Sequence, residues 1–413
     1  DEAYKQEDRL RYHGRDLALL RGREQACPVL LGSATPAVIT WQRAQQGELI
    51  RLCLPRRVRE AALPTMEVVD LRSAGKLEEG FLGRRLKQGL IDTVAAGHQA
   101  IVFLNRRGFA PALICTACGK SLGCPACALS LTLHQKRQRL VCHTCGHQRP
   151  LPPQCPHCGA PAESLKPLGL GTEAVADKLQ ELFPEWRVGR LDRDTAETPT
   201  QLRRILKAVA NHELDLLVGT QMLTKGHHFP LIRLVGVLLA DQALTLPDYR
   251  AAERAFVLLT QVAGRAGREG GPGRVIVQSY DPGHHAVAAA LAHDAEGFYA
   301  KELEYRKELG YPPFARLLAL RLEGIDEARV RRAAEELGQR LEAARRQIEP
   351  RAQLLGPAPA AVARVAGRWR YLMLLKSPGA AAAAHILRLG LHQAGDLPAG
   401  VRLIVDVDPL NLI

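Results

Sequence analysis

Residues 81–111, FLGRRLKQGLIDTVAAGHQAIVFLNRRGFAP, decide the fold class of this 413-residue chain. Apolar residues recur at helical spacing in the first half of the stretch, and a short apolar run follows at residues 100–104. This pattern predicts an amphipathic helix, then a buried strand, then a basic loop. A helix and a strand joined in this way make one α/β unit.

The same order of elements recurs beyond an interruption that is rich in cysteine. Helix-then-strand patterns occupy residues 171–192 and 200–220. Further strands are predicted at residues 234–241 and 273–280, with a helix at 249–267 between them. An α/β domain with a mostly parallel sheet flanked by helices is the simplest fold for these elements. The cysteine-rich block is then an insertion into that domain.

Two other stretches extend this plan. CPVLLGSATP at residues 27–36 predicts a short buried strand that runs into a polar loop. After residue 308 the pattern changes to a strand, a long charged helix at 325–345, two strands, a helix at 378–391 and a final strand at 401–407. This order resembles the split βαββαβ arrangement and predicts a C-terminal α+β domain.

Charge and composition narrow the class of protein. Lysine and arginine number 56 against 43 acidic residues, and a net charge of +13 favours a polyanionic partner such as nucleic acid. No apolar run reaches the roughly 18 residues of a membrane span, so we expect a cytoplasmic protein with no membrane partner. Cys27 and Cys53 stand apart from the other cysteines and are interpreted as buried or inert thiols.

Eight of the ten cysteines form four C-x-x-C pairs, separated by gaps of five, fourteen and nine residues. Each pair can turn the backbone so that two thiolates face one tetrahedral zinc ion, and eight thiolates therefore predict two sites of four cysteines each. Three ways of combining the pairs exist. We favour the nested one, because the inner pairs can close a hairpin that the outer pairs then clamp. Its ligand sets are Cys115, Cys118, Cys155 and Cys158 for one ion and Cys124, Cys127, Cys142 and Cys145 for the other.

Structural zinc is favoured over two other interpretations of these pairs. A catalytic zinc ion keeps an open coordination position, which a set of four thiolates does not leave. A redox C-x-x-C is disfavoured because four pairs follow one another. The neighbouring His134, His143, His147 and His157 are interpreted as solvated side chains and not as ligands.

A second signal comes from GTQMLTKGHHFP at residues 219–230 and QVAGRAGREG at residues 261–270. A strand that ends in Gly-Thr and a helix that ends in two arginines suit a site that reaches an NTP bound by another domain. Arg265 and Arg268 can project together from the helix end. An arginine finger that acts on a γ-phosphate raises the rate by roughly 10³ to 10⁵.

In these motifs the chain resembles the bacterial primosomal replication-restart DNA helicases, which form the PriA family of helicase superfamily 2. The resemblance covers essentially the whole chain. It rests on the four C-x-x-C pairs and on YKQEDRLRYHGRDLALLR, LGSATPA, FLNRRGFAP, LGLGTEAVADKL, DRDT, GTQMLTKGHHFP, AERAFVLLTQVAGRAGR, ELGYPPFARL and VDVDPLNLI.

The resemblance implies a role for several of these residues. Gln261, Arg265 and Arg268 match the catalytic motif that faces the γ-phosphate, and Gly264 and Gly226 lie in motifs beside the nucleotide. An aromatic-rich loop at the start of the chain, the S-A-T motif, the basic loop after residue 104 and the Gly-Thr strand end match DNA-contacting segments. The implied DNA contacts are Tyr4, Lys5, Arg11, Tyr12, His13, Ser33, Thr35, Arg106, Arg107, Thr220 and Lys225. Asp1 and Glu2 match positions just after the family's D-E-x-H motif, where solvated side chains are expected.

The implied domain plan places RecA-like P-loop helicase lobes around the zinc module. Residues 1–60 match the end of a truncated first lobe, and residues 61–112 and 160–308 match the second lobe. The two-zinc module, with four cysteines for each ion, spans residues 113–159, and a C-terminal domain that binds DNA or a partner spans 309–413. No G-x-x-x-x-G-K-[ST] loop and no D-E-x-H motif occur, so we expect both in a longer parent chain.

The function that the resemblance implies is an ATP-dependent 3′ to 5′ DNA helicase that recognises stalled or recombined forks and starts primosome assembly. Its cofactors are two structural Zn²⁺ ions and ATP with Mg²⁺. Its partners are single-stranded and forked DNA, primosome proteins, the replicative helicase loader and single-stranded DNA-binding protein. The alternative is a zinc-bearing DNA-binding primosome scaffold that does not hydrolyse ATP and whose arginines only contact phosphate.

Overall fold

The structure is a computed structural model. It describes residues 2–6, 8, 11–54, 63–75, 77–105, 112–134, 138–167, 171–224, 229, 231–267, 273–392 and 397–412.

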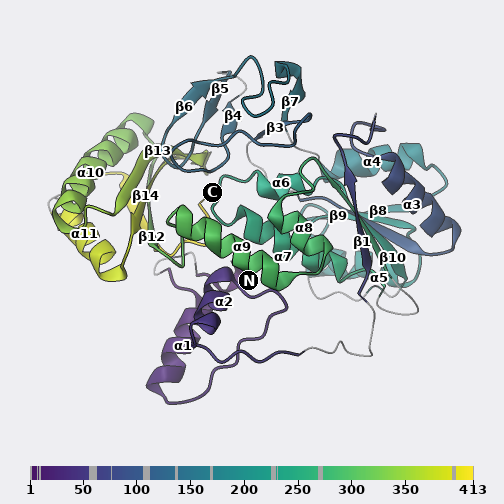
Figure 1. Ribbon diagram of the computed structural model, residues 1–413, viewed down its shortest axis with the longest axis horizontal. Helices are drawn as coiled ribbons and strands as arrows, with labels where there is room; N and C mark the ends of the chain where they lie inside the picture. The colour runs from purple at the N-terminus through teal and green to yellow at the C-terminus, as the bar shows by residue number, and fades with distance from the viewer. Residues whose placement is uncertain are drawn as a thin grey trace.

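A six-stranded sheet forms the centre of the larger α/β unit, on the right of Figure 1. Its strand order is β1-β11-β10-β2-β9-β8, and every neighbouring pair runs parallel. The strands are β1 (Thr65–Asp70), β2 (Gln99–Phe103), β8 (Val188–Leu191), β9 (Leu216–Gly219), β10 (Ile232–Val237) and β11 (Arg274–Ser279). The predicted parallel sheet is confirmed.

Helices cover both faces of this sheet, so side chains that alternate along a strand enter two different cores. In β2, Ala100 and Val102 face one core, and Ile101 and Phe103 face the other. Burial on both faces explains why these strands are continuous apolar runs. The first face is covered by α3 (Arg84–Ala95) and α4 (Thr172–Leu182), and the second by α5 (Pro199–Ala210), α7 (Ala251–Ala263), α8 (His285–Leu291) and α9 (Ala295–Glu308).

Local sequence explains where several of these elements begin and end. The capping box of α5 is complete, because Thr198 accepts a hydrogen bond from the Gln201 amide and the Gln201 side chain accepts one from the Thr198 amide. The strand predicted at 234–241 ends earlier, at Val237, because Asp241 begins the short helix α6 (Asp241–Leu244). The Asp241 carboxylate there accepts hydrogen bonds from the backbone N–H groups that follow β11.

The N-terminal segment contains the short 3-10 helix η1 (Glu2–Tyr4), α1 (Gly14–Glu24) and α2 (Val38–Gln45), at the bottom of Figure 1. The strand predicted at 27–36 is wrong: these residues form no strand, and Leu30 is 86% exposed. An apolar run becomes a buried strand only beside a sheet that can accept it, and the described strands pair elsewhere. Cys27 and Cys53 are exposed, so they are not buried thiols, and their inertness stays a prediction.

The cysteine-rich block forms two small antiparallel sheets above the α/β unit (Figure 1). One sheet pairs β3 (Leu113–Cys115) with β7 (Leu165–Pro167), which closes the block at its base. The other joins β4 (Thr132–His134), β5 (Arg139–Val141) and β6 (Gln148–Pro150). The two ends of the described block, at Leu113 and Pro167, therefore lie side by side.

The C-terminal part has the predicted order of elements, on the left of Figure 1. They are β12 (Arg316–Gly324), α10 (Glu327–Ile348), β13 (Gln353–Val365), β14 (Arg368–Ser377), α11 (Ala380–His392) and β15 (Val401–Val407). The sheet is antiparallel with the order β13-β14-β12-β15. Helices α10 and α11 cover one face, and the cysteine-rich block packs on part of the other. The βαββαβ arrangement is confirmed, whereas the limits of the domains stay a prediction.

No helix within the described ranges is long and apolar enough to cross a membrane.

Candidate functional site

Two clusters of four thiols lie in the cysteine-rich block, and their grouping is the nested one. In each cluster all four sulfur atoms lie within 4.8 Å of one another. The Sγ atoms are 3.7 Å apart for Cys115 and Cys158, and 3.5 Å apart for Cys124 and Cys145. Four Zn–S bonds of about 2.3 Å in a tetrahedron place sulfur atoms roughly 3.8 Å apart, so both clusters fit Zn²⁺.

The four cysteine pairs share one backbone turn. In each, the residue after the second cysteine donates its N–H to the carbonyl of the first, at 2.7 to 2.9 Å, and has a positive φ. That residue is glycine in three turns, which suits a left-handed conformation, and Ala128 in the fourth, where φ is 55°. The turns place the two thiols of each pair on the same side of their loop.

The thiols of the inner cluster perturb one another strongly. A hydrogen bond with Cys127 lowers the pKa of Cys142 to about 5, and the same contact raises the pKa of Cys127. Four thiolates at such distances repel one another unless a cation lies between them. The donor set, its geometry and its burial all suit a structural metal ion.

The Gly-Thr strand end lies at the carboxyl edge of the parallel sheet, where open α/β sheets bind ligands. β9 ends at Gly219, and a Cβ there would lie 2.5 Å from the carbonyl oxygen of Leu191, so only glycine fits. Thr220 is mostly buried, and the 3-10 helix η5 (Gln221–Thr224) packs on α7. The strand-end motif and the helix of the arginine motif are therefore neighbours.

Helix α7 ends earlier than predicted. Its last residue is Ala263, with Gly264 as its C-cap, and Arg265 lies in the following turn with only 8% of its surface exposed. Gly267 has φ 70°, a left-handed conformation in which a helix cannot continue, and its N–H donates to the carbonyl of Ile232. The prediction that the helix itself ends in the arginines is wrong, because α7 ends at Ala263 and Arg265 lies in the turn that follows. Gln261, in the last turn of α7, is exposed.

Two family models match the chain. The model described as "PriA DNA helicase Cys-rich region (CRR) domain" matches residues 124–150, and "Primosomal protein N C-terminal domain" matches residues 307–410. A replication restart protein PriA of Treponema pallidum is 40% identical over 414 residues, which cover 100% of this chain and 61% of that protein. The corresponding protein of Bacillus subtilis is 39% identical over 379 residues, which cover 91% of this chain and 46% of that protein. The chain belongs to the PriA family.

The chain spans about half to three fifths of the length of these curated PriA relatives. Among solved structures, S. cerevisiae Dbp5 bound to RNA and ADP BeF3 is 14% identical with a TM-score of 0.32, over 70% of this chain and 57% of that one. Mycobacterium smegmatis helicase Lhr bound to ssDNA and AMP-PNP is 12% identical with a TM-score of 0.29, over 57% of this chain and 22% of that one. A likeness this low says nothing about function.

The predicted DNA contacts of the N-terminal segment divide into two groups. Tyr4 is 65% exposed, and Tyr12 is exposed too, so both rings can meet a base. Lys5 is directed inward, where its Nζ lies 2.7 Å from Asp406 Oδ1. Arg11 pairs with the same carboxylate at 3.5 Å, and His13 is buried and caps α1 by accepting the Arg15 N–H. Lys5 and Arg11 are therefore held by a carboxylate of the C-terminal sheet.

The S-A-T segment is tied to two helices of the α/β unit. Ser33 Oγ accepts the Thr35 N–H at 3.1 Å within the turn. Just beyond, the Pro36 carbonyl accepts a hydrogen bond from Tyr299 on α9, and the Val38 N–H donates to Glu253 on α7 at 3.2 Å. These bonds couple the position of the S-A-T segment to α7, whose far end leads to Arg265.

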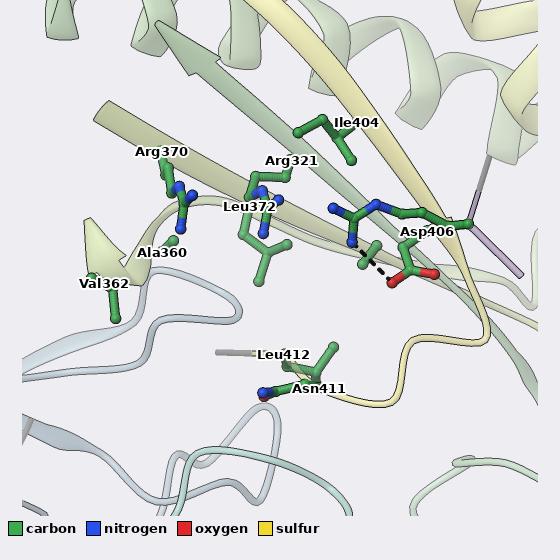
Figure 2. A pocket seen from close by; sticks show the side chains of 11 residues that line it. Arg321, Ala360, Val362, Arg370, Leu372, Ile404, Asp406, Asn411 and Leu412 are labelled. Carbon is green, nitrogen blue, oxygen red and sulfur yellow. Dashed lines mark ion pairs between the residues drawn. The ribbon is translucent and has the colours of Figure 1, made fainter. Parts of the chain in front are cut away.

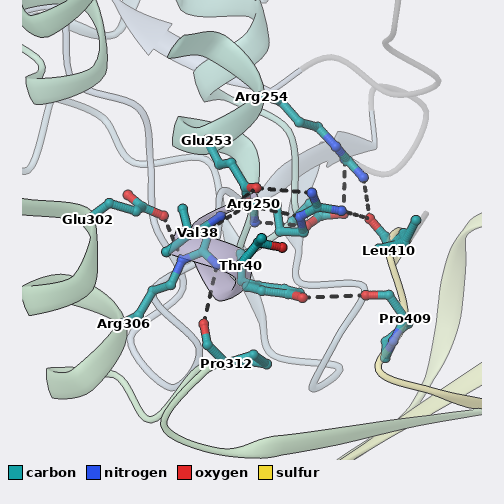
Figure 3. Close-up of polar contacts among 12 residues, drawn as sticks. Val38, Thr40, Arg250, Glu253, Arg254, Glu302, Arg306, Pro312, Pro409 and Leu410 are labelled. Carbon is teal, nitrogen blue, oxygen red and sulfur yellow. Dashed lines mark hydrogen bonds and ion pairs between the residues drawn. The ribbon is translucent and has the colours of Figure 1, made fainter. Parts of the chain in front are cut away.

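Glu253 is a residue that sequence reasoning missed. It is 3% exposed and lies at the centre of a buried ionic network (Figure 3). Arg250 and Arg306 donate to its carboxylate at 3.0 and 2.8 Å, and Arg306 also donates to Glu302 at 2.8 Å. Burial alone would raise the pKa of Glu253, but the positive charges of the two arginines outweigh it and hold that pKa well below its usual range.

The same network anchors the C-terminal end of the chain. The carbonyl of Leu410 accepts hydrogen bonds from Arg250 and Arg254, and the N–H of Leu412 donates to Asp248 at 3.2 Å. Figure 3 shows the segment after β15 meeting the start of α7 in this way. The start of α7 therefore joins the C-terminal domain to the α/β unit.

One histidine of the block, His143, is not solvated, which corrects the interpretation made from the sequence for that residue. His143 is buried, its Nδ1 lies 2.9 Å from the Pro359 carbonyl oxygen, and its Nε2 lies 3.1 Å from His134 Nε2. The turn that carries His143 packs on β13, which keeps water away from the ring. Burial lowers the pKa of His143. His157 is exposed, as expected.

Several predicted site residues lie outside the described residues. They are Asp1, Arg106, Arg107, Lys225, Gly226 and Arg268.

Proposed function

We propose that the protein of which this chain is a part is an ATP-dependent 3′ to 5′ DNA helicase that acts at stalled or recombined replication forks and starts primosome assembly. Membership of the PriA family carries the proposal. The juxtaposition of η5 with α7 at the carboxyl edge of the parallel sheet supports it, because that edge is where the second lobe of a RecA-like motor would meet a nucleotide.

In this proposal the arginine motif serves ATP bound by an upstream lobe. Arg265 and Arg268 stabilise the negative charge that develops on the γ-phosphate, and Gln261 orients the groups around it. The burial of Arg265 supports such a role, because a guanidinium held in a fixed position costs little reorganisation when the nucleotide arrives. The P-loop lysine and the acidic Mg²⁺ ligands are expected upstream of residue 1.

The eight clustered cysteines would hold two Zn²⁺ ions, which supply folding energy and no chemistry. Cys124, Cys127 and Cys142 belong to the core that the block shares with the C-terminal sheet, so the metal would fix the position of that sheet as well. The hydroxyl of Tyr311, which precedes β12, donates a hydrogen bond to the Cys127 carbonyl at 3.2 Å and so links the cysteine-rich block to the C-terminal part of the chain.

DNA binding in this proposal begins at the aromatic-rich loop. Tyr4 and Tyr12 stack on bases, and Ser33, Thr35 and Thr220 lie in segments that follow the DNA backbone. Primosome proteins, the replicative helicase loader and single-stranded DNA-binding protein are the proposed protein partners, on the strength of family membership.

The direct test is unwinding by the full-length protein. A forked DNA with a 3′ single-stranded arm and a fluorophore–quencher pair on the duplex is incubated with ATP and Mg²⁺. Strand separation that requires hydrolysable ATP, and that is absent with a 5′ arm alone, supports the proposal. DNA binding without ATP hydrolysis would contradict it and would favour a zinc-bearing scaffold.

A further inference from the structure

The two thiol clusters of the cysteine-rich block lie against different parts of the molecule. The outer cluster is Cys115, Cys118, Cys155 and Cys158, and the inner cluster is Cys124, Cys127, Cys142 and Cys145. The first turn of the outer cluster packs on the loop that follows β11, because a Cβ added to Gly119 would clash with the Tyr280 carbonyl oxygen. Beside this contact, Lys120 Nζ lies 3.0 Å from the Asp281 carboxylate. The outer cluster therefore adjoins the carboxyl edge of the parallel sheet, where β11 ends.

The loop after β11 is itself fixed from within the α/β unit. The Asp241 carboxylate accepts hydrogen bonds from the backbone N–H groups of Tyr280 and Asp281, at 2.8 and 2.9 Å. It also accepts one from the Ser279 hydroxyl at 2.9 Å. Asp241 is buried, so its three hydrogen bonds are strong and hold the loop in one position. Since this loop cannot move aside, a glycine at position 119 is what lets the two backbones meet.

The inner cluster contacts the C-terminal sheet instead. Its turn at residues 142–146 lies on β13, where His143 Nδ1 is 2.9 Å from the Pro359 carbonyl oxygen. Three of its cysteines belong to one core with Ala360 and Leu372, which Figure 2 shows on the face of the C-terminal sheet that α10 and α11 leave open. The sulfur atoms that would hold the inner ion are thus part of the packing between the block and that sheet.

The two clusters also differ in their exposure to water. In the outer cluster Cys158 is exposed and Cys118 is half-buried. In the inner cluster Cys145 is half-buried and the other three cysteines are buried. The shell around a metal site controls how easily solvent and a competing ligand reach the ion. A chelator should therefore remove the outer ion before the inner one.

We propose that the two metal sites fasten the block to two different parts of the chain, the outer site to the α/β unit and the inner site to the C-terminal sheet. Because a structural zinc ion stabilises the loops that carry its ligands, loss of the outer ion alone would free the block from the loop after β11. The contacts with β13 would stay. This division of roles rests on the two metal sites of the proposed function and on no part of its motor.

A matched pair of glycine variants of the full-length protein tests the outer contact. Gly119 and Gly159 each follow the second cysteine of an outer pair, with φ of 79° and 75°, so an alanine strains both turns alike. Ala128 occupies the same place in an inner turn, which shows that such a turn accepts alanine. Among the described residues, nothing lies within 4 Å of a Cβ added to Gly159, whereas one added to Gly119 meets the loop after β11.

Hydrogen–deuterium exchange is measured on both variants after elemental analysis has confirmed two zinc ions in each. Peptides from residues 279–284 should exchange about tenfold faster in Gly119→Ala, and peptides from residues 356–360 should not change. Gly159→Ala should match the wild type in both regions. Equal exchange of residues 279–284 in the two variants would overturn the proposed contact of the outer cluster with the α/β unit.

Stepwise removal of zinc tests the division between the two sites. The full-length protein is mixed with the chelating dye 4-(2-pyridylazo)resorcinol, whose absorbance reports zinc release, and is sampled by pulsed hydrogen–deuterium exchange. Faster exchange at residues 279–284 should accompany release of the first ion, and faster exchange at residues 356–360 should accompany release of the second. Cys158→Ser should hold one zinc ion and show only the first change, before any chelator is added.

Simultaneous loosening of both regions, or loosening of residues 356–360 first, would overturn the inference, because the block would then unfold as one unit or from the other side. ATPase and unwinding play no part in these measurements, so a negative result would leave the helicase proposal intact.

Discussion

Replacing Glu253 should loosen the junction between the S-A-T segment, helix α7 and the C-terminal tail. The Glu253→Ala change removes the acceptor of the Val38 N–H and leaves Arg250 and Arg306 buried without their shared partner. Breaking a buried ion pair from one side costs about 3 to 5 kcal/mol. Arg306 keeps Glu302 and the Pro312 carbonyl as partners, so the lower end of that range is expected, about 3 kcal/mol.

Hydrogen–deuterium exchange measures this effect where it arises, since an unfolding midpoint of a multidomain chain mixes several transitions. Peptides from α2 and α7 should exchange about 100-fold faster in Glu253→Ala, which is the factor that about 3 kcal/mol corresponds to. Glu336→Ala, an exposed carboxylate on α10, serves as the control and should change nothing. If Val38 and its neighbours stay as protected as in the control, the network does not hold this junction and the reasoning is refuted.

The effect has a defined pH dependence. The pKa of Glu253 in the folded chain lies below its ordinary value of 4.5. A carboxyl group with a lowered folded pKa contributes stability that is complete above its unfolded pKa and is lost as the pH falls through the folded value. The difference in protection between wild type and Glu253→Gln should therefore be constant from about pH 7 to about pH 5 and shrink below that. A difference that grows on acidification would contradict the assignment.

Three further predictions concern the zinc clusters and the N-terminal loop. Elemental analysis of the purified chain should return two zinc ions per molecule, and Cys127→Ser should reduce that number to one. A single zinc ion in the wild type, or iron in place of zinc, would contradict two zinc sites of four cysteines each. Asp406→Asn should raise affinity for single-stranded DNA a few-fold at low salt, because it removes the negative charge that pairs with Lys5 and Arg11. Unchanged or weaker binding would refute this. Tyr12→Ala and Tyr4→Ala should each weaken single-stranded DNA binding by about 1 to 3 kcal/mol in an anisotropy titration. An affinity equal to that of the wild type would show that these rings do not stack on bases.

Local patterns in the sequence were enough for much of the fold. The periodicity of residues 84–95 and 200–210 predicts helices because each buries one face on the sheet. The C-x-x-C spacing predicts tight turns for a similar reason, since the constraint lies within five residues. The nested pairing was favoured on chain geometry and agrees with the sulfur positions.

What the sequence did not reveal depends on partners that lie far along the chain. Glu253 sits three residues from Arg250 and resembles an exposed helix pair, but Arg306, 53 residues away, completes its burial. Lys5 and Asp406 are separated by about 400 residues, so no window of sequence predicts their ion pair. The apolar run within residues 27–36 does not form a strand. A strand needs a neighbouring strand to which it can hydrogen-bond, and the local propensity of one segment does not show whether that neighbour is present.

The DNA-stimulated ATPase of the full-length protein with Arg268→Ala, measured beside wild type at saturating forked DNA, tests the proposed motor most directly. An arginine that stabilises the γ-phosphate in the transition state should, when removed, lower kcat by roughly 10³-fold or more and leave DNA affinity nearly unchanged. An ATPase that survives this substitution would contradict the claim that the arginine motif after α7 acts on ATP.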